Sequence, residues 1–262
     1  MPTNILFLYN NLFDSATITA SSADSDYPAS NLQDTFRTSQ WKTAGDPAGT
    51  ANLVINHGSA KPVTACCLID HDDWAVVPGT FDLEFHTADS WGSPDSTEDL
   101  TAKFAVTPDS NLNPTTIIKI FTSISKQYNR LNIVNAAGDW TLGRIFLGTY
   151  FSPTRNFSPS GRPVPYDASV ISISPGGEIH ADEKTVFRTY DISFRVATYA
   201  QWQAFQLFFN TVKYSKSFFV AFNYDSYAAE MTWYAKIMKD SFNITSITST
   251  VFEITMTIKE EI

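Results

Sequence analysis

Residues 70–74 hold the densest group of side chains that could do chemistry, in the order Asp-His-Asp-Asp-Trp. Carboxylate oxygens this close together can share a hard cation such as Ca²⁺. The segment lacks the glycine and the distal glutamate of an EF-hand loop, so a solvated turn explains the same residues. The sequence therefore predicts an exposed turn, and it keeps Asp70, Asp72 and Asp73 as a weak candidate set for calcium.

Tryptophans near expected strand ends suggest a second kind of chemistry, the binding of a sugar. The apolar face of a sugar ring stacks on an indole, and neighbouring carboxylates, amides or guanidinium groups bond its hydroxyls. Trp74 and Trp91 occupy such positions, and with Asp72 and Asp73 they form the candidate ligand-binding set. Structural packing is the competing interpretation for both tryptophans. It is the prediction for Trp41, which follows a turn into a core strand.

No recognisable catalytic set accompanies these candidates. The chain has no Cys-x-x-Cys pair, no phosphate-binding glycine loop and no Gly-x-Ser-x-Gly elbow. Its four histidines also lack the spacing of a metal site: His57, His71, His86 and His180. We therefore predict a protein that is not an enzyme, with no catalytic residues and no cofactor.

The composition favours a folded chain built mainly from β-strands. Of the 262 residues, 43% are hydrophobic, 17% are charged and 14% are aromatic, with 20 Phe and 11 Tyr. Aromatic side chains suit the pleated, half-buried surface of a sheet. This much apolar surface is sufficient for a real core, which argues against long disordered stretches.

The formal net charge of −9 argues against binding along a phosphate backbone. An acidic surface can still form the wall of a DNA conduit, because it repels the cargo. Cys66 and Cys67 are neighbours, so in a strand they point to opposite faces and are poorly placed to pair with each other. We expect folding in a reducing cytoplasm, with no signal peptide and no membrane-spanning segment.

Short apolar or alternating runs separated by polar turns predict eight or so strands in the first part of the chain. Residues 80–86 alternate, with Phe81, Leu83 and Phe85 expected inside and the polar residues between them outside. The other expected strands cover residues 4–9, 16–19, 51–56, 63–69, 116–123, 128–134 and 143–150. Strands in this number suit a jelly-roll β-sandwich.

The second part of the chain has a different pattern. Residues 152–185 are rich in proline and predict an extended connector with one short strand at 170–173. A strand at 188–197 and a helix at 199–210, capped by Thr198, come next. Further strands are expected at 218–222, 230–238 and 251–258. The sequence thus predicts two domains, 1–164 and 165–262, the second a smaller β-sandwich with one packed helix.

Taken in order, several segments resemble a discoidin-type, galactose-binding-like jelly roll over about residues 4–151. The resemblance rests on four places. The first is the entry loop Tyr-Pro-Ala-Ser-Asn-Leu at 27–32, followed by Thr-Ser-Gln-Trp at 38–41. The others are the paired core strands at 52–56 and 63–69, the turn at 68–73, and the two closing strands at 128–133 and 143–148. In that turn Asp72 replaces an asparagine. The strand, helix and three strands of 188–258 resemble the tail-tube-like domain of bacteriophage distal tail and hub proteins.

Together the two resemblances imply a structural protein of a phage tail tip, such as a distal tail or baseplate protein. It would form a homo-oligomeric ring through its C-terminal domain, contact other tail proteins, and project its N-terminal domain towards a protein or a host-surface glycan. DNA would pass the lumen only as cargo, and the protein would not insert into a membrane. The expected location is the virion, after assembly in the host cytoplasm.

Two other functions compete with the tail protein. The first is a lectin-like carbohydrate-binding module without a ring-forming role, which the loop aromatics and the acidic turn favour. The second is a carbohydrate-active enzyme, which requires two placed carboxylates with separated pKa values. No such pair stands out in the sequence.

Overall fold

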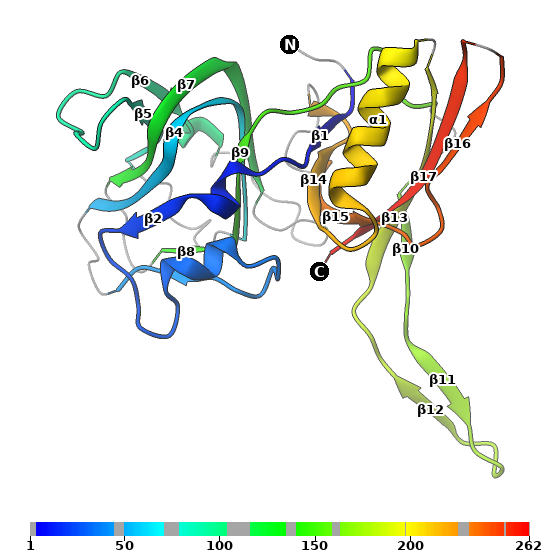
Figure 1. Ribbon diagram of the computed structural model, residues 1–262. Helices are drawn as coiled ribbons and strands as arrows, with labels where there is room; N and C mark the ends of the chain where they lie inside the picture. The colour runs from blue at the N-terminus through cyan, green and yellow to red at the C-terminus, as the bar shows by residue number, and fades with distance from the viewer. Residues whose placement is uncertain are drawn as a thin grey trace. The chain divides into compact units, whose positions relative to one another are not determined.

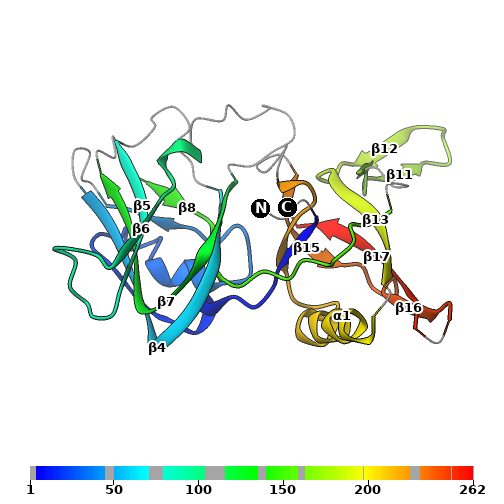
Figure 2. The same cartoon turned by 90° about the horizontal axis from the view of Figure 1, so that it is seen from above.

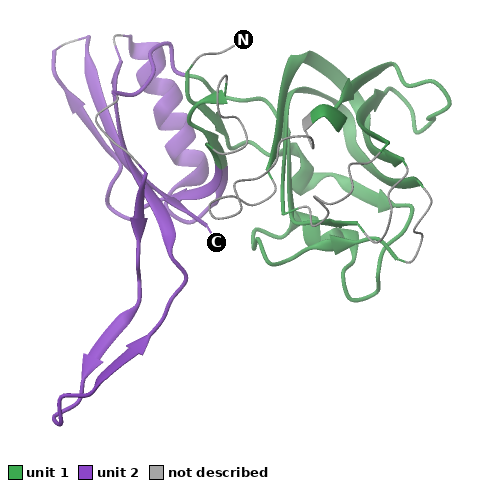
Figure 3. Cartoon of the chain, turned by 180° about the vertical axis from the view of Figure 1, so that it is seen from behind, with its two compact units in different colours: residues 1–152, 219–232 green, residues 153–218, 233–262 purple. Residues whose placement is uncertain are grey.

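The computed structural model divides the chain into two compact units (Figure 3). Unit 1 comprises Met1–Ser152 and Phe219–Thr232, and unit 2 comprises Pro153–Phe218 and Trp233–Ile262. The structure describes residues 4–44, 50–70, 79–103, 116–134, 140–158, 163–196, 198–224, 231–248 and 250–261. Most of the regular structure is β-strand, as the sequence predicted (Figure 1).

Unit 1 is built on a curled antiparallel sheet with the strand order β2-β4-β7-β5-β6 (Figures 1 and 2). These strands are β2 Thr17–Ala20, β4 Thr50–Ile69, β5 Thr80–His86, β6 Ser96–Asp99 and β7 Ile117–Val134. A sixth strand, β9 Arg144–Gly148, pairs with the second half of β4. A separate pair joins β3 Trp41–Lys42 to β8 Thr141–Leu142. Short 3₁₀ helices lie at Leu12–Ser15, Ala29–Gln33 and Thr101–Lys103.

The alternating pattern of β5 sets which side chains enter the core of unit 1. Phe81, Leu83 and Phe85 are fully buried, as predicted, and they join a cluster that also contains Trp41 and Trp140. The Trp140 ring stacks on Phe81 with 6.3 Å between ring centroids. The packing role predicted for Trp41 is thereby confirmed, since its side chain is 0% exposed.

β4 is unusually long because it changes its pairing partway along. Its register with β7 shifts between Asn56 and Lys61, and Gly58 lies there at a φ of 73°, a conformation that favours glycine. Beyond the shift, Cys66 and Cys67 are both buried and free. Burial raises the pKa of the Cys66 thiol to about 12, so both residues act as small core side chains.

The units do not follow the predicted division at residues 164 and 165. Residues 219–232 belong to unit 1, although they come late in the chain, because β14, Phe218–Ala221, pairs antiparallel with β1, Leu6–Leu8. The Tyr224 hydroxyl also accepts a hydrogen bond from the Ile120 backbone N–H at 3.2 Å. Pairing between strands more than 200 residues apart leaves no local signal in the sequence, so composition alone placed the boundary in the proline-rich connector.

Unit 2 contains an antiparallel sheet in which β17, Phe252–Glu260, lies between β13, Phe187–Val196, and two shorter strands. The shorter strands are β15 Thr232–Ile237 and β16 Asn243–Ser246, while β10 Val164–Tyr166 pairs with the other side of β13. Helix α1, Tyr199–Val212, packs against this sheet, with Phe205 against Phe194 and Trp202 against Phe252 (Figure 2). Among the described residues, no helix is long and apolar enough to cross a membrane.

The predicted helix is confirmed and extends two residues further than expected. Thr198 caps it as predicted, because its side-chain oxygen accepts from the Gln201 backbone N–H at 3.3 Å. Phe205, Phe208 and Val212 form the fully buried stripe. Phe209 lies beside this stripe and stacks on Phe242 with 4.2 Å between centroids.

A two-stranded arm extends from the sheet of unit 2 (Figure 1). Its strands are β11 Val170–Ile173 and β12 Ile179–Asp182, which pair with each other and with no other strand in the described part of the chain. The sequence predicted the first strand and missed the second. The turn between them contains Gly177 at a φ of 87°, and Ser174 and Glu178 close it through a 2.8 Å backbone hydrogen bond. The Pro-Gly-Gly sequence before an alternating run was the available hairpin signal.

Candidate functional site

A set of polar and aromatic side chains in unit 1 lies on the outer face of β5 and β7. The register places Glu84 opposite Arg130 and Asp82 opposite Asn132. The loop after β5 brings Trp91 over the same face. We call this set the Trp91 patch, and it comprises Glu84, His86, Trp91, Arg130 and Asn132.

Backbone hydrogen bonds hold the loop that carries Trp91. The Asp95 N–H donates to the Phe85 carbonyl at 2.9 Å, and the Thr87 N–H donates to the Asp95 carboxylate at 3.1 Å. The His86 Nδ1 accepts from the Ala88 N–H at 2.9 Å. Because these bonds span both ends of the loop, the position of Trp91 is set by the strands.

The Trp91 indole is partly exposed and packed among charged groups. The Arg130 guanidinium carbon lies 4.7 Å from the indole centroid, a cation–π geometry. The His86 ring centroid lies 6.2 Å from the indole, at an interplanar angle of 60°. The indole N–H donates to the Asp89 carboxylate at 2.7 Å. These contacts keep the ring at the surface, where it can meet a ligand.

A charged network fixes the polar half of the patch. Arg130 donates from Nε to a Glu84 carboxylate oxygen at 2.6 Å, and the Asn132 amide donates to the other oxygen at 3.4 Å. The Glu84 side chain is only 8% exposed, and that of Arg130 is 16% exposed. A charge-assisted bond at this depth orients the guanidinium beneath the indole. The patch therefore offers an indole, an imidazole and an amide in fixed relative positions.

The carboxylates beside the patch differ in their acidity. Burial raises the pKa of Asp82 above its usual value, and the negative charges of Asp99 and Glu84 add to that effect. Hydrogen bonds from Thr101 lower the pKa of Asp99. Asp82 therefore gives up its proton less readily than an exposed aspartate does.

This shift predicts a pH-dependent effect of the substitution Asp82→Asn. Because the folded state favours protonated Asp82, the contribution of Asp82 to the stability falls as the pH rises from the unfolded value of 3.8 through the folded pKa. We expect Asp82→Asn to be more stable than wild type at pH 7, with the difference vanishing below pH 3.8. Urea unfolding at several pH values measures it, with exposed Asp26→Asn as the control. A gain at pH 7 that persists unchanged in acid would show that the titration of Asp82 is not its cause.

The sequence-predicted residues fall into two groups. Trp91 lies in the patch on the outer face of β5 and β7. Asp72, Asp73 and Trp74 lie outside the described residues, so their roles stay predictions. The patch partners of Trp91 were not predicted, because the register that brings Arg130 opposite Glu84 has no signal in either strand alone.

Asp70, the described member of the calcium set, has both carboxylate oxygens engaged. Arg37 donates to them from Nε at 2.6 Å and from Nη2 at 2.7 Å, and the Asp70 side chain is 13% exposed. Within the described ranges, no three His, Cys, Asp or Glu side chains come together as a metal site. A calcium ion at Asp70 would therefore compete with a bidentate ion pair, and calcium binding stays a prediction for the turn.

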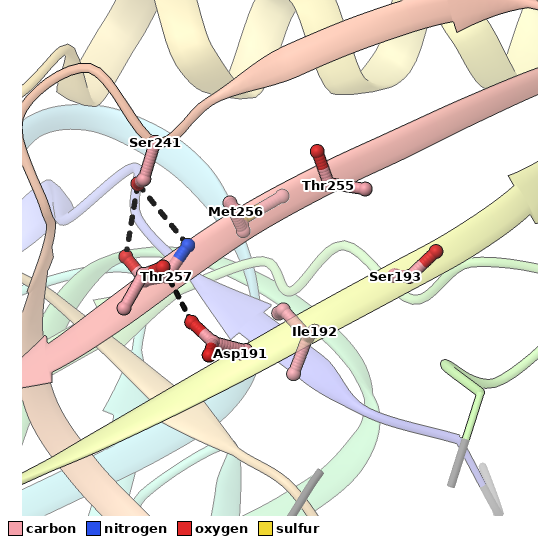
Figure 4. A pocket seen from close by; sticks show the side chains of 7 residues that line it. All are labelled: Asp191, Ile192, Ser193, Ser241, Thr255, Met256 and Thr257. Carbon is pink, nitrogen blue, oxygen red and sulfur yellow. Dashed lines mark hydrogen bonds between the residues drawn. The ribbon is translucent and has the colours of Figure 1, made fainter. Parts of the chain in front are cut away.

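Unit 2 contains a hollow of about 270 Å³ on the outer face of β13 and β17 (Figure 4). Its walls include Asp191, Ser193, Ser241, Thr255 and Thr257. These groups largely satisfy one another: the Thr257 hydroxyl donates to Asp191 at 2.5 Å, and the Thr257 N–H donates to the Ser241 hydroxyl at 3.1 Å. The dashed bonds in Figure 4 join side chains that line the hollow to one another, which leaves fewer of their polar groups for a ligand. The Trp91 patch is therefore the stronger candidate for a ligand site.

No family model matches the chain. No curated protein matches it either. Among solved structures, it is similar to chitosan-binding module 1 from a Paenibacillus sp. IK-5 chitosanase/glucanase, with 18% identity and a TM-score of 0.40, over 54% of this chain and 100% of that one.

Two further neighbours are of the same kind. A fucose-binding module of Streptococcus pneumoniae has 12% identity and a TM-score of 0.41, over 53% of this chain and 95% of that one. The family 32 module of C. perfringens NanJ in complex with galactose has 15% identity and a TM-score of 0.39, over 56% of this chain and 99% of that one. These structural neighbours are carbohydrate-binding modules.

Proposed function

We propose that unit 1 is a carbohydrate-binding module and that it binds sugar at the Trp91 patch. The observation that carries this proposal is the partly exposed indole held against Arg130 and His86 on a rigid sheet face. A sugar ring would stack on the indole, and the amide of Asn132, the imidazole and the carboxylate of Asp89 would bond its hydroxyls. This function requires binding only and no reaction.

The substitution Trp91→Ala tests the proposal directly. Removing the indole takes away the stacking surface, so we expect sugar affinity to fall about tenfold or more. Titration calorimetry with a chitosan oligosaccharide, fucose and galactose provides the measurement on the full chain. The matched control is Phe36→Ala, since Phe36 is a 67% exposed aromatic residue of unit 1 outside the patch.

Two results would count against sugar binding at this patch. One is the absence of measurable heat with all three sugars at millimolar concentration. The other is equal affinity of the wild-type and Trp91→Ala proteins, which would move the site elsewhere in the chain. Circular dichroism of each variant shows whether the fold is retained.

A second candidate function is a structural component of a phage tail tip that assembles into a homo-oligomeric ring. The observation that favours self-assembly is the arm of unit 2, where every residue of β11 and β12 is exposed. The tail itself, its other proteins and the virion location follow from the sequence resemblance. In this role unit 1 would project outward to contact a protein or a host glycan, so the two functions are compatible.

The mass of the full chain at several concentrations, together with negative-stain images, tests this second candidate. Closed rings with a central hole would support it. A strict monomer at all concentrations would count against it and leave carbohydrate binding as the function of the chain.

A further inference from the structure

The two faces of the arm have different chemistry. In the register of β11 with β12, Ile171 lies opposite Ala181 and Ile173 lies opposite Ile179. Side chains alternate along a strand, so these four residues share one face of the hairpin. The other face carries Val170, Ser172, His180 and Asp182, which is a mixed and mainly polar set.

The apolar face of the arm has no cover in the single chain. Ile171 is 68% exposed, Ile173 is 69% exposed and Ile179 is 70% exposed. An isolated two-stranded hairpin is marginally stable at best in water, because it buries too little apolar surface. A contiguous apolar face of this kind marks a contact surface, so the arm calls for a partner that covers it.

The charge of the arm restricts what that partner can be. Between residues 163 and 186 there are four acidic residues and one lysine. Among these acidic residues, a Glu178 carboxylate oxygen lies 3.9 Å from Nε2 of His180, and an Asp182 carboxylate oxygen lies 2.6 Å from Nζ of Lys184. Two arms stacked face to face would bring their excess negative charge together, which is unfavourable. A basic surface with exposed apolar side chains fits the arm better.

Unit 2 itself presents such a surface at the end of α1. Phe209 stacks on Phe242, and the Tyr214 ring packs at its edge with 5.1 Å between centroids. Met238, in the turn after β15, is 45% exposed. Lys213, Lys216 and Lys239 are exposed in the same segments, and none of the ion pairs among the described residues uses them. We call this surface the aromatic–lysine patch.

We propose that the arm of one copy docks on the aromatic–lysine patch of a second copy of this chain. The isoleucine face would cover the partly exposed aromatic side chains and the exposed Met238, while the acidic residues of the arm would approach the lysines. The inference rests on the second candidate function, self-assembly, and names the surfaces that produce it. Because arm and patch are different surfaces, a docked pair still has one free patch and one free arm, so further copies can add until a ring closes or a filament grows.

The test compares variants of the full chain by sedimentation velocity between micromolar and about 100 µM protein. We expect wild type to form oligomers, and Ile171→Asp combined with Ile173→Asp to weaken self-association about 100-fold or more, because charges would enter a buried interface. Val170→Asp is the matched control, since Val170 is 59% exposed on the other face of the same strand. It should associate almost as wild type does.

Charge reversal identifies the receiving surface. Lys213→Glu combined with Lys239→Glu should also weaken association, and adding Glu178→Lys and Glu183→Lys on the arm should restore it. A wild-type monomer at the highest concentration would overturn both the docking and the self-assembly function. Oligomers that survive the isoleucine variant, or a lysine variant that the arm reversal fails to rescue, would overturn the docking alone.

Discussion

Replacing Trp41 by alanine is expected to lower the free energy of unfolding of unit 1 by about 3–5 kcal/mol. The Trp41 side chain is 0% exposed, and it lies in the core cluster of the unit. Its indole N–H also donates to the Ser22 carbonyl at 3.1 Å, so the substitution removes a buried hydrogen bond together with a large volume. Neighbouring strands cannot collapse into such a space without losing their own packing.

Urea unfolding followed by circular dichroism measures the effect of Trp41→Ala. Phe36→Ala is the control, because a 67% exposed aromatic side chain leaves no cavity and its loss should change stability by only about 0.5 kcal/mol. A loss below about 1 kcal/mol for Trp41→Ala would mean that the core of unit 1 tolerates the space. That outcome would contradict the close packing of this cluster.

Breaking the ion pair between Arg188 and Glu260 is expected to have a similarly large effect in unit 2, about 3–5 kcal/mol. Arg188 donates to the two Glu260 carboxylate oxygens at 2.7 Å from Nε and at 2.6 Å from Nη2. The two side chains are 13% and 7% exposed, and the guanidinium carbon lies 4.6 Å from the Trp233 ring centroid. Glu260→Leu therefore leaves the guanidinium in a poorly solvated place without the carboxylate that accepts these two hydrogen bonds.

The double variant Arg188→Met with Glu260→Leu separates the charge from the packing. Removing both charges also removes the cost of desolvating them, so we expect the double variant to lie within about 1–2 kcal/mol of wild type. Thermal and urea unfolding of both single variants and the double variant form a cycle that gives the coupling energy. If Glu260→Leu alone costs less than about 1 kcal/mol, the pair behaves as a solvated surface pair.

Local patterns predicted the elements whose side chains repeat with a clear period. The alternation of residues 80–86 correctly predicted the burial of Phe81, Leu83 and Phe85, and the aromatic spacing after Thr198 predicted α1. Glu84, expected to face outward, is buried by its ion pair with Arg130. Both patterns are properties of short segments, because the burial of one face decides them. The same reasoning placed Trp41 in the core and left the two cysteines unpaired.

Features that depend on distant pairing had no such signal. The Trp91 patch exists because β5 and β7 pair with Glu84 opposite Arg130, and neither strand alone specifies this register. The return of residues 219–232 to unit 1 depends on the β1–β14 pair. The arm is a different case: its Pro-Gly-Gly turn was visible in the sequence, but the surrounding prolines made the segment resemble a connector.

The return of β14 to unit 1 also sets an order of events during synthesis. A ribosome releases the chain from its N-terminal end, and domains tend to fold as they emerge. Here β1 has to wait for its partner, because Leu6 pairs with Ala221. The β1–β14 ladder therefore cannot form until more than 200 further residues have been translated, whereas the backbone hydrogen bonds between Phe7 and Phe151 need fewer than 150.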